Sequence, residues 1–228
     1  MTLPPAVSSI LPADTARTWE TIAPAIPEGA YLAGGTALAV HLHHRQSRDL
    51  DFFFGDAALD LDALDRRLRT LGPFAVTSRA PDTLNGLFSQ TRVQFLGARG
   101  QINLEQPIPI AGIRVLGLSD ILAMKVKVIG DRGELRDYFD LKRIEQITGR
   151  TFEEGLGLYM SRYGVKPEDA SIMHIVTALG YLDDVDEDDL LPESKQEIAQ
   201  YWTRRQPEVI RNLSRFGASP TTGEKTVE

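Results

Sequence analysis

The amino-acid sequence predicts an α+β fold in which a lobe of strands and helices is followed by a lobe made of helices. Up to about residue 117, short apolar or alternating segments are interleaved with helical ones, whereas almost every later segment shows helical spacing. Hydrophobic residues make up 42% and charged residues 25% of the 228 residues, which is typical of a globular chain with a substantial core. No linker rich in proline, glycine or serine separates the two parts, so we expect lobes 1–117 and 118–228 to pack tightly.

The first lobe is expected to begin with an irregular arm and to continue with helices and short strands. Leu61, Leu64 and Leu68 share one face of a predicted helix, which is the pattern of an amphipathic helix. Asn85-Gly86 and the segment 97–100 are typical of turns between strands. The expected helices are 14–26, 36–44 and 59–71, and the expected strands are 31–33, 49–54, 76–78, 87–89, 92–96, 102–104 and 113–115.

The second lobe is expected to consist of helices joined by short connections. Gly130 is expected to end the first helix, and Asp131 with Glu134 to form the capping box of the next. Residues 183–189 hold six acids in seven positions, which predicts a solvated loop that repels RNA and lies away from any nucleic-acid path. The expected helices are 119–129, one that runs to about 147, 152–162, 168–182 and 193–213.

Composition excludes several classes of function. The chain has no cysteine, so disulfides, zinc–thiolate sites, iron–sulfur clusters and cysteine nucleophiles are excluded. The net charge of −7 argues against non-specific binding of nucleic acid, so no DNA partner is expected and RNA would need a local basic patch. No apolar run approaches the roughly 20 residues of a membrane span, and the N-terminus has no features of a secretory signal. We expect a cytoplasmic protein without a membrane partner.

The tripeptide Asp49-Leu50-Asp51 is the most informative segment. Alternate residues of a strand face the same side at roughly 6.6 Å, so Asp49 and Asp51 would repel each other unless a cation neutralises them. Hard carboxylate oxygens suit Mg²⁺, with Mn²⁺ as an alternative. An edge strand with two solvated acids is the alternative interpretation of such a short motif.

The segment Gly34-Gly35-Thr36 follows a short predicted strand and opens a predicted helix. Glycines at a helix N-terminus allow backbone N–H groups to approach a phosphate, although a plain tight turn would look the same. A glycine turn, a helix and then a strand with two acids place a phosphate cradle beside a metal site. This order indicates phosphoryl or nucleotidyl transfer.

These residues carry a resemblance to the AbiEii/AbiGii nucleotidyltransferase toxin family, within the DNA polymerase β-like superfamily. Residues 32–53, LAGGTALAVHLHHRQSRDLDFF, are similar to the first motif of the family. Residues 120–129 and 132–141 resemble its lysine-bearing helix and the element R-x-x-x-R-D-x-x-D-L, and residues 178–184 resemble the acidic end of a late helix. The resemblance spans about residues 30–205.

The resemblance implies a mixed-sheet catalytic lobe, a helical lobe, and metal-dependent transfer of a nucleotide from an NTP, with the 3′ end of tRNA as an acceptor. It also implies a cognate antitoxin. The matching positions are Asp49 and Asp51 for the metal, Gly34, Gly35 and Thr36 for the phosphates, Lys125 near the triphosphate, and Arg136, Asp137 and Asp140 in the R-D-x-x-D element.

One departure from the superfamily concerns a third acid on a neighbouring strand. The inward polar position of strand 92–96 is expected to be Gln94, and Asn103 and Glu105 lie farther on. Without a third carboxylate, the acceptor hydroxyl lacks an evident base. Asp137 or Asp140 would then have to serve.

Several other residues have two interpretations each. Arg45 and Ser47 precede the acidic strand and are expected near the NTP, whereas an exposed loop arginine is the alternative. Lys125 would otherwise be a lysine at a helix edge. Arg136 and Asp140 are four residues apart, as are Arg132 and Arg136, so they form either an ion-pair ladder or an Arg136 held by Asp140 and aimed at phosphate or RNA. His41 and His44 lack a third zinc ligand at a suitable spacing and are expected at a partly exposed helix end.

The leading hypothesis is a magnesium-dependent nucleotidyltransferase that transfers NMP to an acceptor hydroxyl, expected at the tRNA 3′ end, as the toxin of a toxin–antitoxin or phage-defence pair. One alternative is nucleotidyl transfer to a small molecule or a protein side chain. Another is a nucleotide- or partner-binding module with weak or no catalysis. A haloacid-dehalogenase-type phosphatase is disfavoured, because Phe52 follows the acids where that class has Thr or Val.

Overall fold

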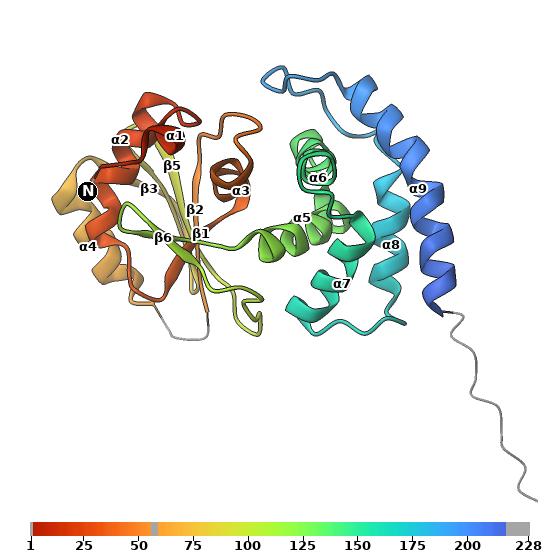
Figure 1. Ribbon diagram of the computed structural model, residues 1–228. Helices are drawn as coiled ribbons and strands as arrows, with labels where there is room; N and C mark the ends of the chain where they lie inside the picture. The colour runs from red at the N-terminus through yellow and green to blue at the C-terminus, as the bar shows by residue number, and fades with distance from the viewer. Residues whose placement is uncertain (1, 56–58, 218–228) are drawn as a thin grey trace, which may run out of the picture.

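The computed structural model describes residues 2–55 and 59–217, and it contains a seven-stranded mixed sheet beside a group of helices (Figure 1). The strands described lie between Ala30 and Val115, and the helices α5 to α9 follow from Leu118 onward. The predicted α+β fold is therefore confirmed. Within the described residues, no helix is both long and apolar enough to cross a lipid bilayer.

The order of the strands places β2 in the middle of the sheet. The sheet runs β3-β4-β5-β2-β1-β7-β6, with β2 antiparallel to β1 and parallel to β5. Asp51 of β2 is in register with Ala33 of β1 and with Gln94 of β5. The strands are β1 (Ala30–Ala33), β2 (Leu50–Phe54), β3 (Phe74–Ala80), β4 (Thr83–Phe88), β5 (Thr91–Gly97), β6 (Ile108–Ile110) and β7 (Ile113–Val115).

The side chains of β2 alternate between two faces of the sheet. Leu50, Phe52 and Phe54 are buried on one face, where the ring of Phe52 stacks on Phe95 at 5.0 Å between centroids. Each such fully buried side chain contributes about 1.5–3 kcal/mol to folding. The residues between them are half-buried on the opposite face. The alternation therefore directs Asp51 away from the core, and Asp49 lies just before the strand rather than within it, as the predicted strand 49–54 had it.

Helices cover both faces of the sheet (Figure 1). Helices α2 and α4 lie on one face, where the hydroxyl of Thr18 is 3.0 Å from that of Thr91. Helix α3 lies on the other face and ends at Leu42, and the next residue, His43, adopts a left-handed conformation with φ of 51°. The helices of this part are α1 (Pro5–Ser8), α2 (Ala13–Ile22), a 3₁₀ turn (Ala23–Ala25), α3 (Gly34–Leu42) and α4 (Leu61–Leu71).

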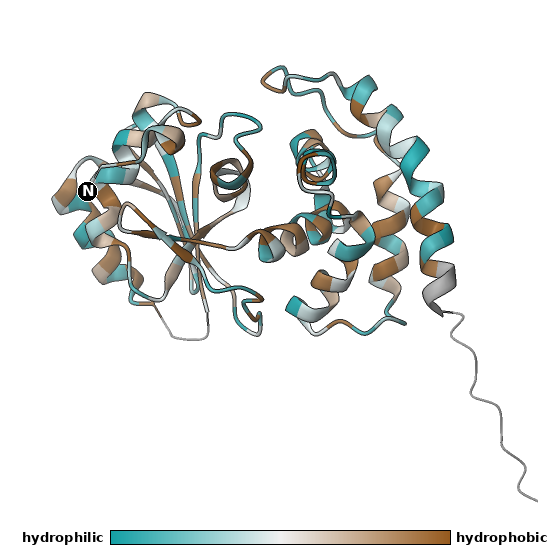
Figure 2. Ribbon diagram, in the orientation of Figure 1, coloured by the Kyte–Doolittle hydropathy of each residue, from teal (hydrophilic) through white to brown (hydrophobic). Residues whose placement is uncertain are grey.

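Helix α5 is the centre of the helical part and is buried along much of its length. Glycines allow its neighbours to approach closely: a Cβ on Gly155 would lie 2.9 Å from Val126, and one on Gly130 would lie 2.6 Å from Ile175. In Figure 2 many residues of α5 and α8 are hydrophobic, whereas those of the outer α9 are largely hydrophilic. The helices are α5 (Leu118–Arg132), α6 (Leu135–Thr148), α7 (Phe152–Tyr163), α8 (Ala170–Leu179) and α9 (Lys195–Gly217).

Four local predictions were wrong. The arm contains helix α1, and Asn85-Gly86 lies inside β4 rather than in a turn, because Gly86 packs directly against the ring of Phe74. Helix α5 continues through Gly130 to Arg132, and Gly130 serves close packing against Ile175 rather than the end of the helix. The capping box of α6 is formed by Glu134 and Asp137, not by Asp131 and Glu134.

Residues 102–104 do not form the predicted strand, because a buried ion pair holds their backbone. Asp120 accepts hydrogen bonds from the backbone N–H groups of Leu104 and Glu105 at 2.8 and 2.9 Å. The fully buried Arg162 pairs with Asp120 and donates to the carbonyl oxygen of Ile102 at 2.7 Å. Hydrogen bonds therefore hold this segment against α5 and α7. The next strand along the chain is β6, which was not predicted.

Candidate active site

A cleft of about 540 Å³ lies between the sheet and helices α5 and α6. Its walls come from β2 and β5, the N-terminus of α3, the loop before β2, the two helices and the segment after α8. Most of the predicted site residues line it, namely Gly34, Gly35, Arg45, Ser47, Asp49, Asp51, Lys125, Arg136 and Asp137. The fold therefore gathers residues from both parts of the chain at one place.

Asp49 and Asp51 both line the cleft, as their alternation along the strand predicts. Burial and the negative charge of Asp49 raise the pKa of Asp51 to about 6, and Lys125 and Arg136 oppose that rise. A raised pKa means that the surroundings of Asp51 do not fully compensate its negative charge. Two hard carboxylates with excess negative charge are a donor set that fits a divalent cation such as Mg²⁺ or Mn²⁺.

The residue beside Asp51 on β5 is Gln94, which also lines the cleft. The prediction that a glutamine stands at this inward position is confirmed. Among the residues that the structure describes, no three His, Asp or Glu side chains come together as a metal-binding group.

The glycine turn lies directly against the acidic strand and the loop before it. Gly34 has φ of +67°, and a Cβ there would come within 2.7 Å of Asp51 Oδ2. A Cβ on Gly35 would come within 2.7 Å of Arg45 Nη2. No side chain caps the N-terminus of α3, so its first N–H groups are free to bind an anion. This geometry suits a phosphate held beside the carboxylates.

The side chain of Thr36 has a supporting position, so only its backbone N–H, in the first turn of α3, is left for the predicted phosphate contact. Its side chain is buried, with 1% exposure, and is not part of the cleft wall. The hydroxyl donates to the carbonyl oxygen of Asp49 and lies 2.7 Å from Ser47 Oγ. Thr36 therefore fixes the backbone that presents Asp49.

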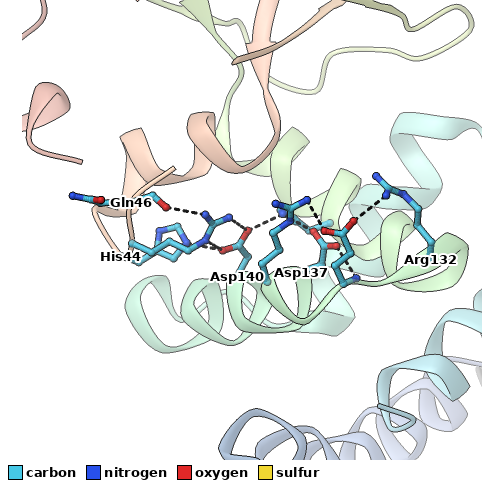
Figure 3. A network of polar contacts seen from close by, with 9 residues as sticks. His44, Gln46, Arg132, Asp137 and Asp140 are labelled. Atoms are coloured by element: carbon cyan, nitrogen blue, oxygen red, sulfur yellow. Dashed lines mark hydrogen bonds and ion pairs between the residues drawn. The ribbon is translucent and has the colours of Figure 1, made fainter. Parts of the chain in front are cut away.

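A network of alternating charges forms the wall opposite the sheet (Figure 3). Asp140 is fully buried and accepts hydrogen bonds from Arg45 Nε and Nη2 at 2.7 and 2.8 Å, while His44 Nε2 lies 2.8 Å away. Lys125 Nζ lies 2.7 Å from both Asp140 Oδ2 and Asp137 Oδ1. The network thus connects the loop after α3 to helices α5 and α6.

The network fixes the charge state of its members. Burial acts to raise the pKa of Asp140, but Lys125 and Arg45 outweigh it and hold this pKa well below its usual range. Burial likewise acts to lower the pKa of Lys125, and Asp137 and Asp140 outweigh it, so the pKa of Lys125 is raised. Lys125 therefore enters the cleft as a cation at neutral pH.

Two predictions for the R-D-x-x-D element need correction. Asp140 is buried behind the cleft wall and binds Arg45 and Lys125, so it neither contacts an NTP nor holds Arg136. Arg136 pairs with Glu134 at 2.5 Å, and Arg132 pairs with the same carboxylate at 3.0 Å. Arg132 ends α5 whereas Arg136 belongs to α6, so the two do not form a ladder on one helix.

Neither acid of this element is available as the predicted base. Asp137 is buried, pairs with Lys125 through one oxygen, and accepts the backbone N–H of Glu134 through the other at 3.0 Å. Asp140 stays ionised and is held by three basic side chains. Both acids position Lys125 and Arg45.

Two sequence interpretations also change in the structure. His44 is buried on Asp140, not partly exposed at a helix end. Residues 188–191, at the end of the acidic run, line the cleft, and Leu190 remains 66% exposed there. The end of the acidic run therefore lies at the candidate site, which the sequence did not predict. No sequence pattern near residues 188–191 predicts their place in the cleft wall, because that place depends on how the segment between α8 and α9 folds back.

Comparisons with known proteins agree with this geometry. The family model described as nucleotidyl transferase AbiEii toxin, type IV TA system, matches residues 21–218. The protein aq_aa25 of Aquifex aeolicus is 33% identical over 175 residues, which cover 75% of this chain and 80% of that protein.

Two solved structures from Helicobacter pylori have a similar fold. One is described as a nucleotidyltransferase; it has a TM-score of 0.52 at 18% identity and covers 87% of this chain and 92% of its own. The other, JHP933, has a TM-score of 0.51 at 17% identity, with coverage of 95% and 97%. The family match over most of the length agrees with the resemblance seen in the sequence motifs. The chain belongs to the AbiEii family of nucleotidyltransferase toxins, which is assigned to type IV toxin–antitoxin systems.

Proposed function

We propose that this enzyme transfers a nucleoside monophosphate from an NTP to a hydroxyl at the 3′ end of tRNA, in a reaction that depends on a divalent cation. The observation that carries the proposal is the meeting of two elements in one cleft. The carboxylates of Asp51 on β2 and of Asp49 just before it lie in the same cleft as the uncapped N-terminus of α3, with Gly34 against Asp51.

The triphosphate of the donor would bind at the glycine turn and the basic wall. The N–H groups at Gly34 and Gly35 are oriented as an anion site by the N-terminus of α3. Lys125, Arg45 and Arg136 line the same cleft and supply positive charge for the phosphates and for the leaving pyrophosphate. Asp137 and Asp140 hold Lys125 and Arg45 in fixed positions, so little reordering is needed when the triphosphate binds.

Asp49 and Asp51 would hold Mg²⁺, with Mn²⁺ as an alternative. When bound, the cation neutralises charge on the α-phosphate and on the attacking oxygen. The acceptor hydroxyl gives its proton to solvent water, and its oxygen forms a bond to the α-phosphorus. The bond from that phosphorus to the β-phosphate bridge breaks, and pyrophosphate leaves with the electron pair. Thr36 contributes by fixing the backbone at Asp49.

The family supports a toxin role, whereas the tRNA acceptor rests on the resemblance of the sequence motifs. The family is described as a toxin of a type IV toxin–antitoxin system, which favours an antitoxin partner. Arg48 and Arg132 line the cleft and have exposed or half-exposed side chains, although the whole chain carries a net charge of −7. Arg132 pairs with Glu134, and Asp188 and Asp189 line the same cleft, so an RNA end would have to approach on the side of Arg48.

Label transfer tests the proposal. The protein is incubated with each α-³²P-labelled NTP, Mg²⁺ and total tRNA, beside Asp51→Asn and the control Asp186→Asn, an exposed acid outside the cleft. We expect label on tRNA with the unchanged chain and the control, and loss of label with Asp51→Asn. Label on a metabolite or on the protein itself would contradict the tRNA acceptor. NTP binding without any transfer would contradict catalysis.

A further inference from the structure

Gln94 stands where it can share a cation with Asp51. Strands β2 and β5 are parallel, with Asp51 in register with Gln94 and Leu50 in register with Val93. Residues in register on neighbouring strands, about 4.8 Å apart, direct their side chains to the same face. Leu50 and Val93 are buried on one face, and Asp51 and Gln94 both line the cleft on the other.

The cleft is poorly equipped to hold a divalent ion by itself. Gln94 offers a neutral amide oxygen beside Asp51, where glutamate would offer a full negative charge. The charges of Lys125 and Arg136 act on Asp51 and disfavour a cation there, although Asp137 and Glu134 pair with these two side chains and limit the effect. Within the part of the chain that the structure describes, no group of three acidic or histidine side chains is assembled.

A bound triphosphate changes each of these conditions. Its oxygens supply the missing anionic ligands, and its charge compensates the basic side chains of the cleft wall. Mg²⁺ commonly takes one or two carboxylates together with substrate phosphates and retains water at its other positions. The two ligands would then favour each other's binding to the same extent, because coupling between binding equilibria is reciprocal.

We propose that Gln94 makes cation binding by Asp49 and Asp51 conditional on the triphosphate, so that ion and NTP bind as strongly coupled ligands. The inference rests on the proposed function, since it requires an NTP in this cleft. It assigns Gln94 a positioning role: because its amide is neutral, the cation has two anionic ligands from the protein instead of three.

Manganese binding to the nucleotide-free protein, followed by the electron paramagnetic resonance signal of free Mn²⁺, tests the inference. Gln94→Glu adds a carboxylate beside Asp51 and should tighten Mn²⁺ binding at least about tenfold. Asn85→Asp is the matched control. It adds the same charge one strand farther away, at a residue in register with Gln94 but outside the cleft wall, and should alter the affinity less than about twofold. Thermal unfolding shows whether each variant is folded, and Gln94→Asp replaces Gln94→Glu if that variant is not.

A second titration measures the coupling. Inorganic triphosphate should tighten Mn²⁺ binding to the unchanged chain at least about tenfold, after subtraction of the ion bound in protein-free samples, and the gain should shrink in Gln94→Glu. Tight Mn²⁺ binding by the unchanged nucleotide-free chain, or a Gln94→Glu variant no tighter than Asn85→Asp, would overturn the inference. If label transfer to tRNA persists in that case, the proposed function stands. If neither triphosphate nor any NTP binds, the proposed function fails and the coupling fails with it.

Discussion

The carboxylate of Asp51 is costly to ionise in the folded chain. Burial and Asp49 raise its pKa from 3.8 to about 6, which corresponds to about 3 kcal/mol of unfavourable free energy in the ionised form. Because the pKa in the folded state lies above that of the unfolded chain, the penalty is absent below about pH 4. It grows as the pH rises and is complete above about pH 6. Such a cost is typical of a site arranged for a charged ligand.

Asp51→Asn should therefore stabilise the protein in the absence of metal and nucleotide. We expect an increase of about 1–3 kcal/mol in the free energy of unfolding at neutral pH, and no difference near pH 4. Urea unfolding at the two pH values measures this. The exposed Asp186→Asn should change stability by less than about 0.5 kcal/mol. If Asp51→Asn is no more stable than the unchanged chain at neutral pH, the surroundings already compensate the negative charge of Asp51.

At the scale of elements, the site depends on how closely α3 approaches β2. Gly34 is the first residue of α3, has positive φ, and leaves no space for a Cβ beside Asp51. Gly149, at the end of α6, also has positive φ at 74°, but nothing lies within 4 Å of the position of its Cβ. The two glycines therefore separate the cost of backbone strain from the cost of displacing the carboxylate.

Gly34→Ala and Gly149→Ala form a matched pair. Both should lose about 1 kcal/mol of stability, because alanine is strained at positive φ. Gly34→Ala should in addition lose more than about tenfold in the rate of label transfer, since Asp51 must move. The rate for Gly149→Ala should stay within about twofold of the unchanged chain. Equal rates for the two variants would mean that contact between α3 and β2 does not set the geometry of the site.

The sequence predicted the elements that local patterns determine. The predicted alternation placed Asp51 and Asp49 on the side of the cleft, although β2 begins only at Leu50, and the glycines that open α3 were found from composition and order. Long-range contacts decided the rest. Residues 102–104 are held by Asp120 and Arg162 rather than by a neighbouring strand, and the acidic run reaches the cleft only because the chain folds back after α8. The partners of Asp140 lie on other elements, so its spacing to Arg136 was misleading.

At the scale of the whole molecule, Asp140 joins the two parts of the chain. It belongs to α6, pairs with Lys125 of α5, and binds Arg45 and His44 from the loop after α3. Because its pKa is lowered in the folded state, its contribution to stability is present above the unfolded pKa of about 3.8 and is lost as the pH falls through the lower folded pKa.

Asp140→Asn should thus destabilise the protein at neutral pH by about 3–5 kcal/mol, because Lys125 and Arg45 lose a buried counter-charge. The difference from the unchanged chain should shrink as the pH is lowered below about 3.8. Urea unfolding followed over this pH range measures both effects. A constant difference at every pH would show that packing, not charge, is what Asp140 contributes.

The central claim is that the paired carboxylates and the glycine turn bind a cation and a triphosphate together. Anomalous diffraction from crystals grown with Mn²⁺ and a non-hydrolysable NTP tests it most directly. The account predicts an anomalous peak between Asp49 and Asp51, with the triphosphate at Gly34 and Gly35 and close to Lys125. A nucleotide bound elsewhere, or one bound in the cleft with no ion at the two carboxylates, would contradict it.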